Sequence, residues 1–286
     1  MTGSGTRSRR WPTPPSCGNG TCCKDLIDSY RPDLVYFDNT GLPLGQAGLD
    51  VTAHYYNSAI AWHGSLQAVV NAKNLPDDRR AAVIEDVERG FRSEILPHPW
   101  QTDTCIGDWH YNRDRFTNKS YMKADAVIHR LCDTVAKNGC LLLSIPVRGD
   151  GSIDEEERKI VDGITGWTQR YGEAIFASRP WRRSGEGPTQ VASGEFGETR
   201  MRPFEAADIR FTTKGATLYA MTMGKPQGAV LVKSLAGVGT VQRVEIVGAT
   251  GQLSFRQAQD GLHVDVPAGA SHDYGVALRI NGERLV

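Results

Sequence analysis

Short apolar segments alternate with amphipathic segments between residue 24 and about residue 170. The segment Leu34–Phe37 is continuously apolar, which is typical of a strand buried on both faces of a parallel sheet. Further strands are predicted at residues 66–70, 81–84 and 141–145, and a helix around residues 53–62. Strands that alternate with helices in this way predict a parallel α/β sheet or barrel.

Two later helices have recognisable ends. Apolar residues recur near helical spacing between Ser120, which can cap a helix, and Gly139, which can end it. Another helix is predicted to begin near Asp154, because the acidic run at residues 154–157 complements the dipole of a helix N-terminus. Both helices extend the α/β pattern.

The pattern changes after about residue 200. Seven short apolar runs lie between Phe211 and Ile280, separated by Gly, Pro, Asn or Asp and without a helical period. Such runs predict an antiparallel β-sandwich. The expected organisation is an irregular leader at residues 1–23, an α/β region at 24–178, a linker at 179–204 and a β-sandwich at 205–286.

Charge and hydropathy exclude several classes of partner. The 33 basic and 33 acidic residues cancel, so no global field favours nucleic acid or an anionic membrane. No stretch approaches the roughly 20 apolar residues that span a bilayer, and the N-terminus lacks the apolar core of a signal peptide. We therefore expect neither a nucleic-acid nor a membrane partner, and the compartment stays undetermined.

The six cysteines lack a metal-binding pattern. Cys17, Cys22 and Cys23 cluster near the N-terminus, but a zinc site needs a second pair of ligands at matching spacing, and none follows. We interpret the cysteines as buried or incidental thiols, and we predict no metal and no cofactor.

Asp38 directly follows the predicted strand Leu34–Phe37. Catalytic residues of parallel barrels lie at the carboxyl ends of strands, so this carboxylate is well placed to act as a nucleophile. Asp38 also begins an Asp-Asn-Thr-Gly sequence that favours a turn, and both interpretations remain open.

Two further segments could carry chemistry. Glu88 and Arg89 follow the apolar run at 81–84, where a carboxyl group and a guanidinium could serve a glycosidase or form a surface ion pair. A retaining glycosidase needs two carboxyl groups about 5 Å apart, one to attack and one to protonate the leaving oxygen. The segment Trp100–Tyr111 combines aromatic rings with a histidine among polar residues, which suits either a sugar site or core packing.

At these segments the sequence resembles glycoside hydrolase family twenty-nine, the α-L-fucosidases. Tyr30–Asp38 is similar to the segment with which that family presents its nucleophilic aspartate, and Trp100–Tyr111 to its tryptophan-led active-site loop. Asn138–Pro146 resembles its last barrel strand, and Tyr171–Trp181 the stretch that leaves the barrel. The resemblance extends over about residues 24–285.

The resemblance implies a fold and a reaction. The fold is a partial (β/α)8 TIM-like barrel at residues 24–178, followed by the antiparallel β-sandwich. The reaction is the hydrolysis of terminal α-L-fucose from a fucosylated glycan or fucoside, through a covalent fucosyl-enzyme and with retention of configuration.

The resemblance also implies roles for individual residues. Asp38 matches the nucleophile. In many relatives a glutamate follows the tryptophan, but Gln101 stands here, and an amide cannot exchange the proton. Glu88 is therefore expected to be the acid/base, with Glu94 as second choice. The expected substrate-binding residues are Arg89, Trp100, Gln101, Trp109 and His110.

The sequence departs from the family before Asp38, which only 37 residues precede. The N-terminal half of the family's barrel is missing, so we expect open barrel edges that favour association with another chain, and little activity of this chain alone. Two alternatives are a non-catalytic carbohydrate-binding remnant of a fucosidase and another retaining exo-glycosidase. Relatives are commonly secreted, periplasmic or lysosomal.

Overall fold

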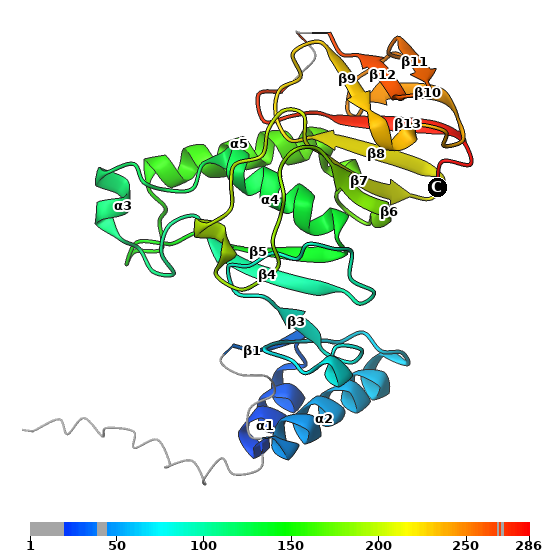
Figure 1. Ribbon diagram of the computed structural model, residues 1–286. Helices are drawn as coiled ribbons and strands as arrows, with labels where there is room; N and C mark the ends of the chain where they lie inside the picture. The colour runs from blue at the N-terminus through cyan, green and yellow to red at the C-terminus, as the bar shows by residue number, and fades with distance from the viewer. Residues whose placement is uncertain (1–19, 39–44, 268, 270–271) are drawn as a thin grey trace, which may run out of the picture. The chain divides into compact units, whose positions relative to one another are not determined.

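The computed structural model describes residues 20–38, 45–267, 269 and 272–286 (Figure 1). The chain divides into two compact units, Met1–Val83 and Ile84–Val286, and each has its own hydrophobic core. Most of the expected leader lies outside the described residues. Its last residues already belong to helix α1 (Thr21–Tyr30), and Cys22 is disulfide-bonded, which corrects the expectation of a thiol there.

The first unit holds one parallel strand pair with a helical crossover. After α1 come β1 (Leu34–Phe37), α2 (Gln46–His63), β2 (Val69–Lys73) and the 3-10 helix η2 (Asp77–Arg79). Strand β1 forms where it was predicted and pairs with β2 so that Phe37 lies opposite Ala72. The predicted burial on both faces is wrong, because Leu34 is exposed and the other three residues are half-buried. The predicted strand at 66–70 is displaced toward the C-terminus, because Val70 and Ala72 are the residues that enter the core.

The second unit begins with three parallel strands and the helices that connect them. Its elements are β3 (Ile84–Asp86), β4 (Trp100–Cys105), α3 (Arg113–Thr117), α4 (Ala124–Ala136), β5 (Gly139–Ser144), α5 (Glu155–Tyr171) and η3 (Gly172–Ala174). Strand β4 pairs with β3 on one side and with β5 on the other. Strand β3 starts where the predicted strand at 81–84 should end, because the N–H groups of Ala82 and Val83 donate to the Arg79 carbonyl and continue a turn.

The two predicted helix starts have different outcomes. Asp154 caps α5 as predicted: its carboxylate accepts from the Glu157 N–H at 2.8 Å, and the Glu157 carboxylate accepts from the Asp154 N–H in return. The predicted cap at Ser120 is wrong, since α4 begins at Ala124. The Ser120 N–H instead donates to the Arg115 carbonyl, at the end of α3.

The rest of the second unit consists of antiparallel strands, as predicted. They are β6 (Arg179–Glu186), β7 (Ile209–Lys214), β8 (Thr217–Thr222), β9 (Ala229–Val232), β10 (Thr240–Ile246), β11 (Phe255–Ala258), β12 (Gly261–Asp265) and β13 (Ala277–Glu283), with the 3-10 helices η4 (Gly197–Thr199) and η5 (Lys233–Leu235). One sheet has the order β10-β13-β8-β7-β6 and the other the order β11-β12-β9.

Strand β6 lies inside the segment that was expected to be a linker. It forms the edge of the five-stranded sheet, and Trp181 in its middle is only 5% exposed. The Trp181 ring packs against Phe211 of β7, with 5.1 Å between ring centroids. A buried aromatic residue therefore turns a Pro- and Arg-rich sequence into an ordered strand.

Helix α4 lies between strand β5 and strands β6 and β7 (Figure 1). Asp133 of α4 is buried and accepts from Arg210 Nε of β7 at 2.6 Å and from Lys137 Nζ at 2.7 Å. The apolar residues of α4 and α5 share one core with the strands of the sandwich. The parallel sheet and the sandwich of this unit thus form one packed body.

Candidate active site

Asp38 directly follows β1 and its side chain is exposed. Its Oδ1 lies 2.9 Å from Nζ of Lys73, the last residue of β2. The parallel register explains this pair, because the preceding residues Phe37 and Ala72 are opposite each other. Asp38 thus lies at the carboxyl end of a parallel strand, the position at which barrels carry catalytic groups.

Glu88 and Arg89 occupy the corresponding end of β3. They are the central residues of a turn that the Gly90 N–H closes by donating to the Val87 carbonyl at 3.2 Å. The Arg89 backbone has φ of 47°, and its N–H donates to the Asp103 carbonyl at 2.9 Å. The turn therefore presents a half-buried carboxyl group and a guanidinium side by side.

The side chains of β4 are buried along its whole length, although most are polar. Gln101 donates through Nε2 to the fully buried carboxylate of Asp86 on β3, which also accepts from the Asp103 N–H at 3.2 Å. Gln101 and Asp103 lie two residues apart and so face the same side of the strand. Gln101 is 9% exposed, which leaves little of it open to a ligand.

Trp100 alternates with Gln101 and has a different environment. It is 1% exposed, and its indole N–H donates to the Lys137 carbonyl at the end of α4 at 2.9 Å. The ring also lies against Gly139, where a Cβ would be 2.6 Å from it. This placement favours packing and does not support the expectation that Trp100 contacts substrate.

Thr102 and Thr104, on the same side of β4 as Trp100, contact a buried charged cluster. Glu198 of η4 accepts from Thr104 Oγ1 at 2.7 Å and from Arg130 of α4 at 2.9 Å. Its other oxygen accepts from the guanidinium of Arg89. The side chains of Glu198 and Arg130 are 8% and 3% exposed. Neither Glu198 nor Arg130 is predicted as a site residue from the sequence.

The loop after β4 carries two more of the expected site residues, Trp109 and His110. Trp109 is 40% exposed, and the Arg89 guanidinium lies over its ring at 6.0 Å from the centroid. His110 is exposed, as is Glu94 in the connection from β3 to β4. The structure thus brings the Arg89 guanidinium, next to Glu88 in the chain, to the Trp109 ring, whereas it places Trp100 and Gln101 in the interior.

Arginine side chains dominate the electrostatics of this region. Burial lowers the pKa of Arg89, but the hydrogen bond with Glu198 and the charge of that carboxylate raise the pKa above its ordinary value. Burial raises the pKa of the Cys105 thiol at the end of β4. Hydrogen bonds from Arg115 and Asn112 lower the pKa of Asp108. The strand ends therefore hold permanently charged guanidinium groups beside acidic groups.

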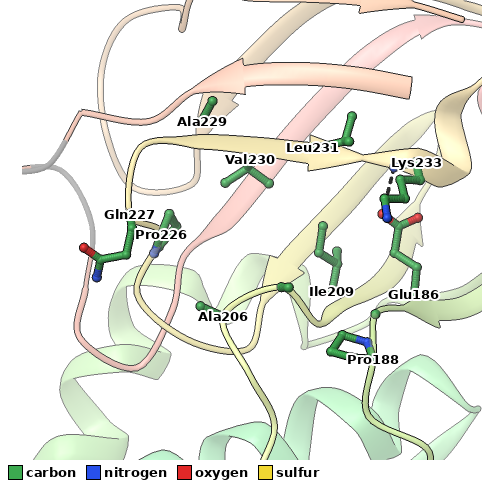
Figure 2. A pocket seen from close by; sticks show the side chains of 12 residues that line it. Glu186, Pro188, Ala206, Ile209, Pro226, Gln227, Ala229, Val230, Leu231 and Lys233 are labelled. Atoms are coloured by element: carbon green, nitrogen blue, oxygen red, sulfur yellow. Dashed lines mark hydrogen bonds between the residues drawn. The ribbon is translucent and has the colours of Figure 1, made fainter. Parts of the chain in front are cut away.

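A separate cavity of about 810 Å³ lies in the sandwich (Figure 2). Apolar side chains such as Ile209 and Val230 line it, and no aromatic ring is among its described lining residues. Glu186 at its edge accepts from the backbone N–H groups of Lys233 and Ser234, at 2.7 and 2.6 Å. Because a sugar ring usually stacks on an aromatic side chain, we do not place the candidate site there.

No group of three or more potential metal-ligating side chains occurs among the described residues. Within the same part of the chain, none of the helices is both long and apolar enough to pass through a bilayer.

Comparison with known proteins identifies the family. The family model described as alpha-L-fucosidase matches residues 20–173, more than half of the 286 residues. The chain belongs to the α-L-fucosidase family. The matched range contains Asp38, Glu88 and the loop with Trp109, and it ends before Glu198.

Similar proteins are fucosidases of greater length. Mouse tissue α-L-fucosidase is 26% identical over 256 residues, which is 85% of this chain and 51% of the mouse protein. The chain therefore spans about half the length of the curated fucosidases that it matches.

Solved fucosidase structures share the fold. A Thermotoga maritima α-L-fucosynthase, an Asp-to-Gly variant in complex with α-L-Fuc-(1-2)-β-L-Fuc-N3, has a TM-score of 0.67 at 22% identity, and the match covers 90% of this chain and 53% of the other. A Bacteroides thetaiotaomicron α-L-fucosidase, trapped as a covalent intermediate with a Glu-to-Gln mutant, has a TM-score of 0.65 at 16% identity, with 92% and 59% covered. These likenesses confirm the predicted partial barrel and β-rich C-terminal region.

Proposed function

We propose that the protein is a retaining α-L-fucosidase, with Asp38 as nucleophile and Glu88 as acid/base. The observation that carries the proposal is the position of Asp38: it lies in the segment that matches the family and directly after a parallel strand. Lys73 holds its carboxylate while leaving it exposed. The proposal concerns the activity of the whole enzyme, because the matched relatives are about twice as long as this chain.

The chemistry takes place in two steps. A carboxylate oxygen of Asp38 attacks the anomeric carbon of fucose, the bond from that carbon to the leaving oxygen breaks, and Glu88 gives its proton to the leaving oxygen. Glu88 then takes a proton from a water molecule, whose oxygen attacks the anomeric carbon and releases the Asp38 carboxylate. Two displacements at one carbon retain its configuration.

Two solved relatives support the assignment of an aspartate and a glutamate. The Thermotoga maritima fucosynthase carries glycine in place of an aspartate, and the Bacteroides thetaiotaomicron enzyme was trapped as a covalent intermediate with glutamine in place of a glutamate. Replacing a nucleophile and an acid/base would have these outcomes. Glu88 is our choice for the glutamate because it lies half-buried at the end of β3, whereas Gln101 is an amide and Glu94 lies away from a strand end.

Arg89 and Trp109 are proposed to bind the substrate. The guanidinium could donate to sugar hydroxyl groups, and the half-exposed indole offers a face to the C–H groups of a sugar ring. His110 is proposed as an additional polar contact from the same loop. For Trp100 and Gln101 we propose a supporting role, because both are buried and hydrogen-bonded to protein groups.

Hydrolysis of 4-nitrophenyl α-L-fucoside, by the purified chain and by the chain completed with the N-terminal half of a matched relative, tests the proposal. Proton NMR of the early products should show the α anomer of L-fucose before mutarotation, since retention is expected. A panel of other aryl glycosides separates a fucosidase from another retaining exo-glycosidase. Binding of fucose without any release would support the alternative of a non-catalytic carbohydrate-binding protein.

A further inference from the structure

The segment formed by residues 193–200, between β6 and β7, runs alongside the turn that carries Glu88. Phe91 and Gly194 exchange backbone hydrogen bonds at 3.0 and 3.1 Å. The Phe196 N–H donates to the Glu88 carbonyl at 2.8 Å, and the Glu198 N–H donates to the Arg89 carbonyl at 3.3 Å. The backbone of the turn is thus hydrogen-bonded to a segment that lies outside the family-matched range, which ends at residue 173.

Close backbone approach makes this pairing possible. A Cβ at Gly90 would lie 2.4 Å from the Gly194 carbonyl oxygen, so a larger residue at position 90 would push residues 193–200 away. Ser93 adds a hydrogen bond from its N–H to Ser193 Oγ at 2.8 Å. The contact between the two segments therefore extends over the whole turn.

Glu198 adds side-chain contacts to this backbone contact. Its carboxylate links the Arg89 guanidinium of the turn to Arg130 of α4 and Thr104 of β4. Arg130 is itself fixed, because it donates to the Gly90 carbonyl at 2.9 Å and to Thr102 Oγ1 at 3.0 Å and lies over the Phe91 ring. One buried carboxylate therefore connects the turn to the helix and the strand behind it.

We propose that Glu198 is a positioning residue, which holds Arg89 and with it the turn that presents Glu88. The inference rests on the proposed function, in which Glu88 exchanges the proton and Arg89 binds substrate. A proton donor that is displaced by about 1 Å loses much of its effect, because general acid catalysis requires hydrogen-bond distance to the leaving oxygen. Residues 193–200, which connect two strands of the sandwich, would then help to position the groups at the carboxyl end of β3.

Amide hydrogen exchange tests the physical link in the full chain. In Glu198→Gln, the amides of residues 88–93 should exchange about tenfold faster or more, because the carboxylate no longer holds Arg89 and Arg130. The amides of α5 should exchange at the wild-type rate. Glu195→Gln is the matched control, since Glu195 lies on the same segment and should leave exchange at 88–93 unchanged. Because Glu198→Gln leaves the buried Arg130 without its anion, Glu198→Asp, which keeps the charge, serves as a second variant.

Kinetics with two leaving groups test the consequence for catalysis. The ratio of kcat/KM between an alkyl fucoside and an activated aryl fucoside should fall about tenfold in Glu198→Gln, since only the alkyl fucoside depends on the proton. The ratio should fall less in Glu198→Asp and stay at the wild-type value in Glu195→Gln. A loss of folded protein lowers both rates equally and leaves the ratio unchanged.

The outcomes separate this inference from the proposed function. Unchanged exchange at residues 88–93 in both Glu198 variants overturns the inference, and so does faster exchange with a wild-type ratio of leaving-group rates. If neither this chain nor the chain completed with the N-terminal half of a matched relative releases fucose, the proposed function fails. Exchange that is faster at 88–93 in the Glu198 variants and not in Glu195→Gln then still supports the hold of Glu198 on the turn.

Discussion

The carboxylate of Asp38 and the ammonium group of Lys73 lie 2.9 Å apart, at the carboxyl ends of two paired parallel strands. The lysine side chain is 6% exposed, whereas that of the aspartate is 66% exposed. Lys73 thus orients a carboxylate that remains open on its other side. A nucleophile needs both orientation and access.

We predict that Asp38→Gly lowers fucoside hydrolysis by about a thousandfold or more, because no covalent intermediate can form without the carboxylate. Azide or formate should restore part of the rate, since a small anion can occupy the space left by the side chain. Hydrolysis of 4-nitrophenyl α-L-fucoside with and without azide measures both effects. Asp33→Gly, at the other end of β1, is the control, and a loss within tenfold for Asp38→Gly would assign the nucleophile elsewhere.

We predict that Glu88→Ala slows fucosides with poor leaving groups at least about a hundredfold more than activated aryl fucosides. The reason is that an acidic phenol leaves without a proton, whereas an alkoxide does not. A series of aryl fucosides with phenols of increasing pKa measures this as a steeper dependence of rate on the leaving group. Glu94→Ala should keep the wild-type dependence, and the steeper slope in that variant instead would move the role to Glu94.

The fold could be predicted largely because local patterns agree with tertiary burial. The apolar run Leu34–Phe37 forms β1, and the acidic start at Asp154 caps α5. Strand β6 was missed, because its only deeply buried large apolar residue, Trp181, stands among Arg, Pro and Gly. Such a sequence gains its order from the strand that pairs with it, which local periodicity does not reveal.

The site could be predicted only in part. The predicted strand ends indicated Asp38 and Glu88. Lys73, the partner of Asp38, and Glu198, the partner of Arg89, are distant from them in sequence and follow from register and topology. One feature of the chain indicates that a partner such as Glu198 is needed. Strand β4 is buried throughout, yet Thr102, Thr104 and the residue between them are polar. Buried polar side chains need hydrogen-bond partners, so the strand required polar groups from elsewhere in the chain.

We predict that two tryptophans of the segment Trp100–Tyr111 contribute very differently to the free energy of unfolding. Trp100→Ala should lower the free energy of unfolding by about 3–5 kcal/mol, because it removes a buried indole and one of the two N–H groups, its own and that of Leu96, that donate to the Lys137 carbonyl. Trp109→Ala should lower it by less than about 1 kcal/mol, since that ring is 40% exposed. Urea unfolding followed by circular dichroism measures both. Fucose affinity should fall in folded Trp109→Ala, and equal stability losses would contradict the assignment of Trp100 to packing.

Finally, we predict that Asp133→Ala lowers the free energy of unfolding by about 3–5 kcal/mol, because it leaves Lys137 and Arg210 as buried cations without their anion. Burial already lowers the pKa of Lys137, so losing the carboxylate should make this amine easier to deprotonate. The stability of Asp133→Ala should therefore recover partly as the pH is raised, as measured by urea unfolding at pH 7 and pH 9. Asp162→Ala, an exposed aspartate on α5, is the control and should change stability by less than about 0.5 kcal/mol.

The combined change Asp133→Leu, Lys137→Met and Arg210→Met should be more stable than Asp133→Ala alone, because it removes the charges together. A triple variant that is less stable than the single one would show that the ion pairs themselves, rather than the cost of unpaired charge, hold α4 against β7.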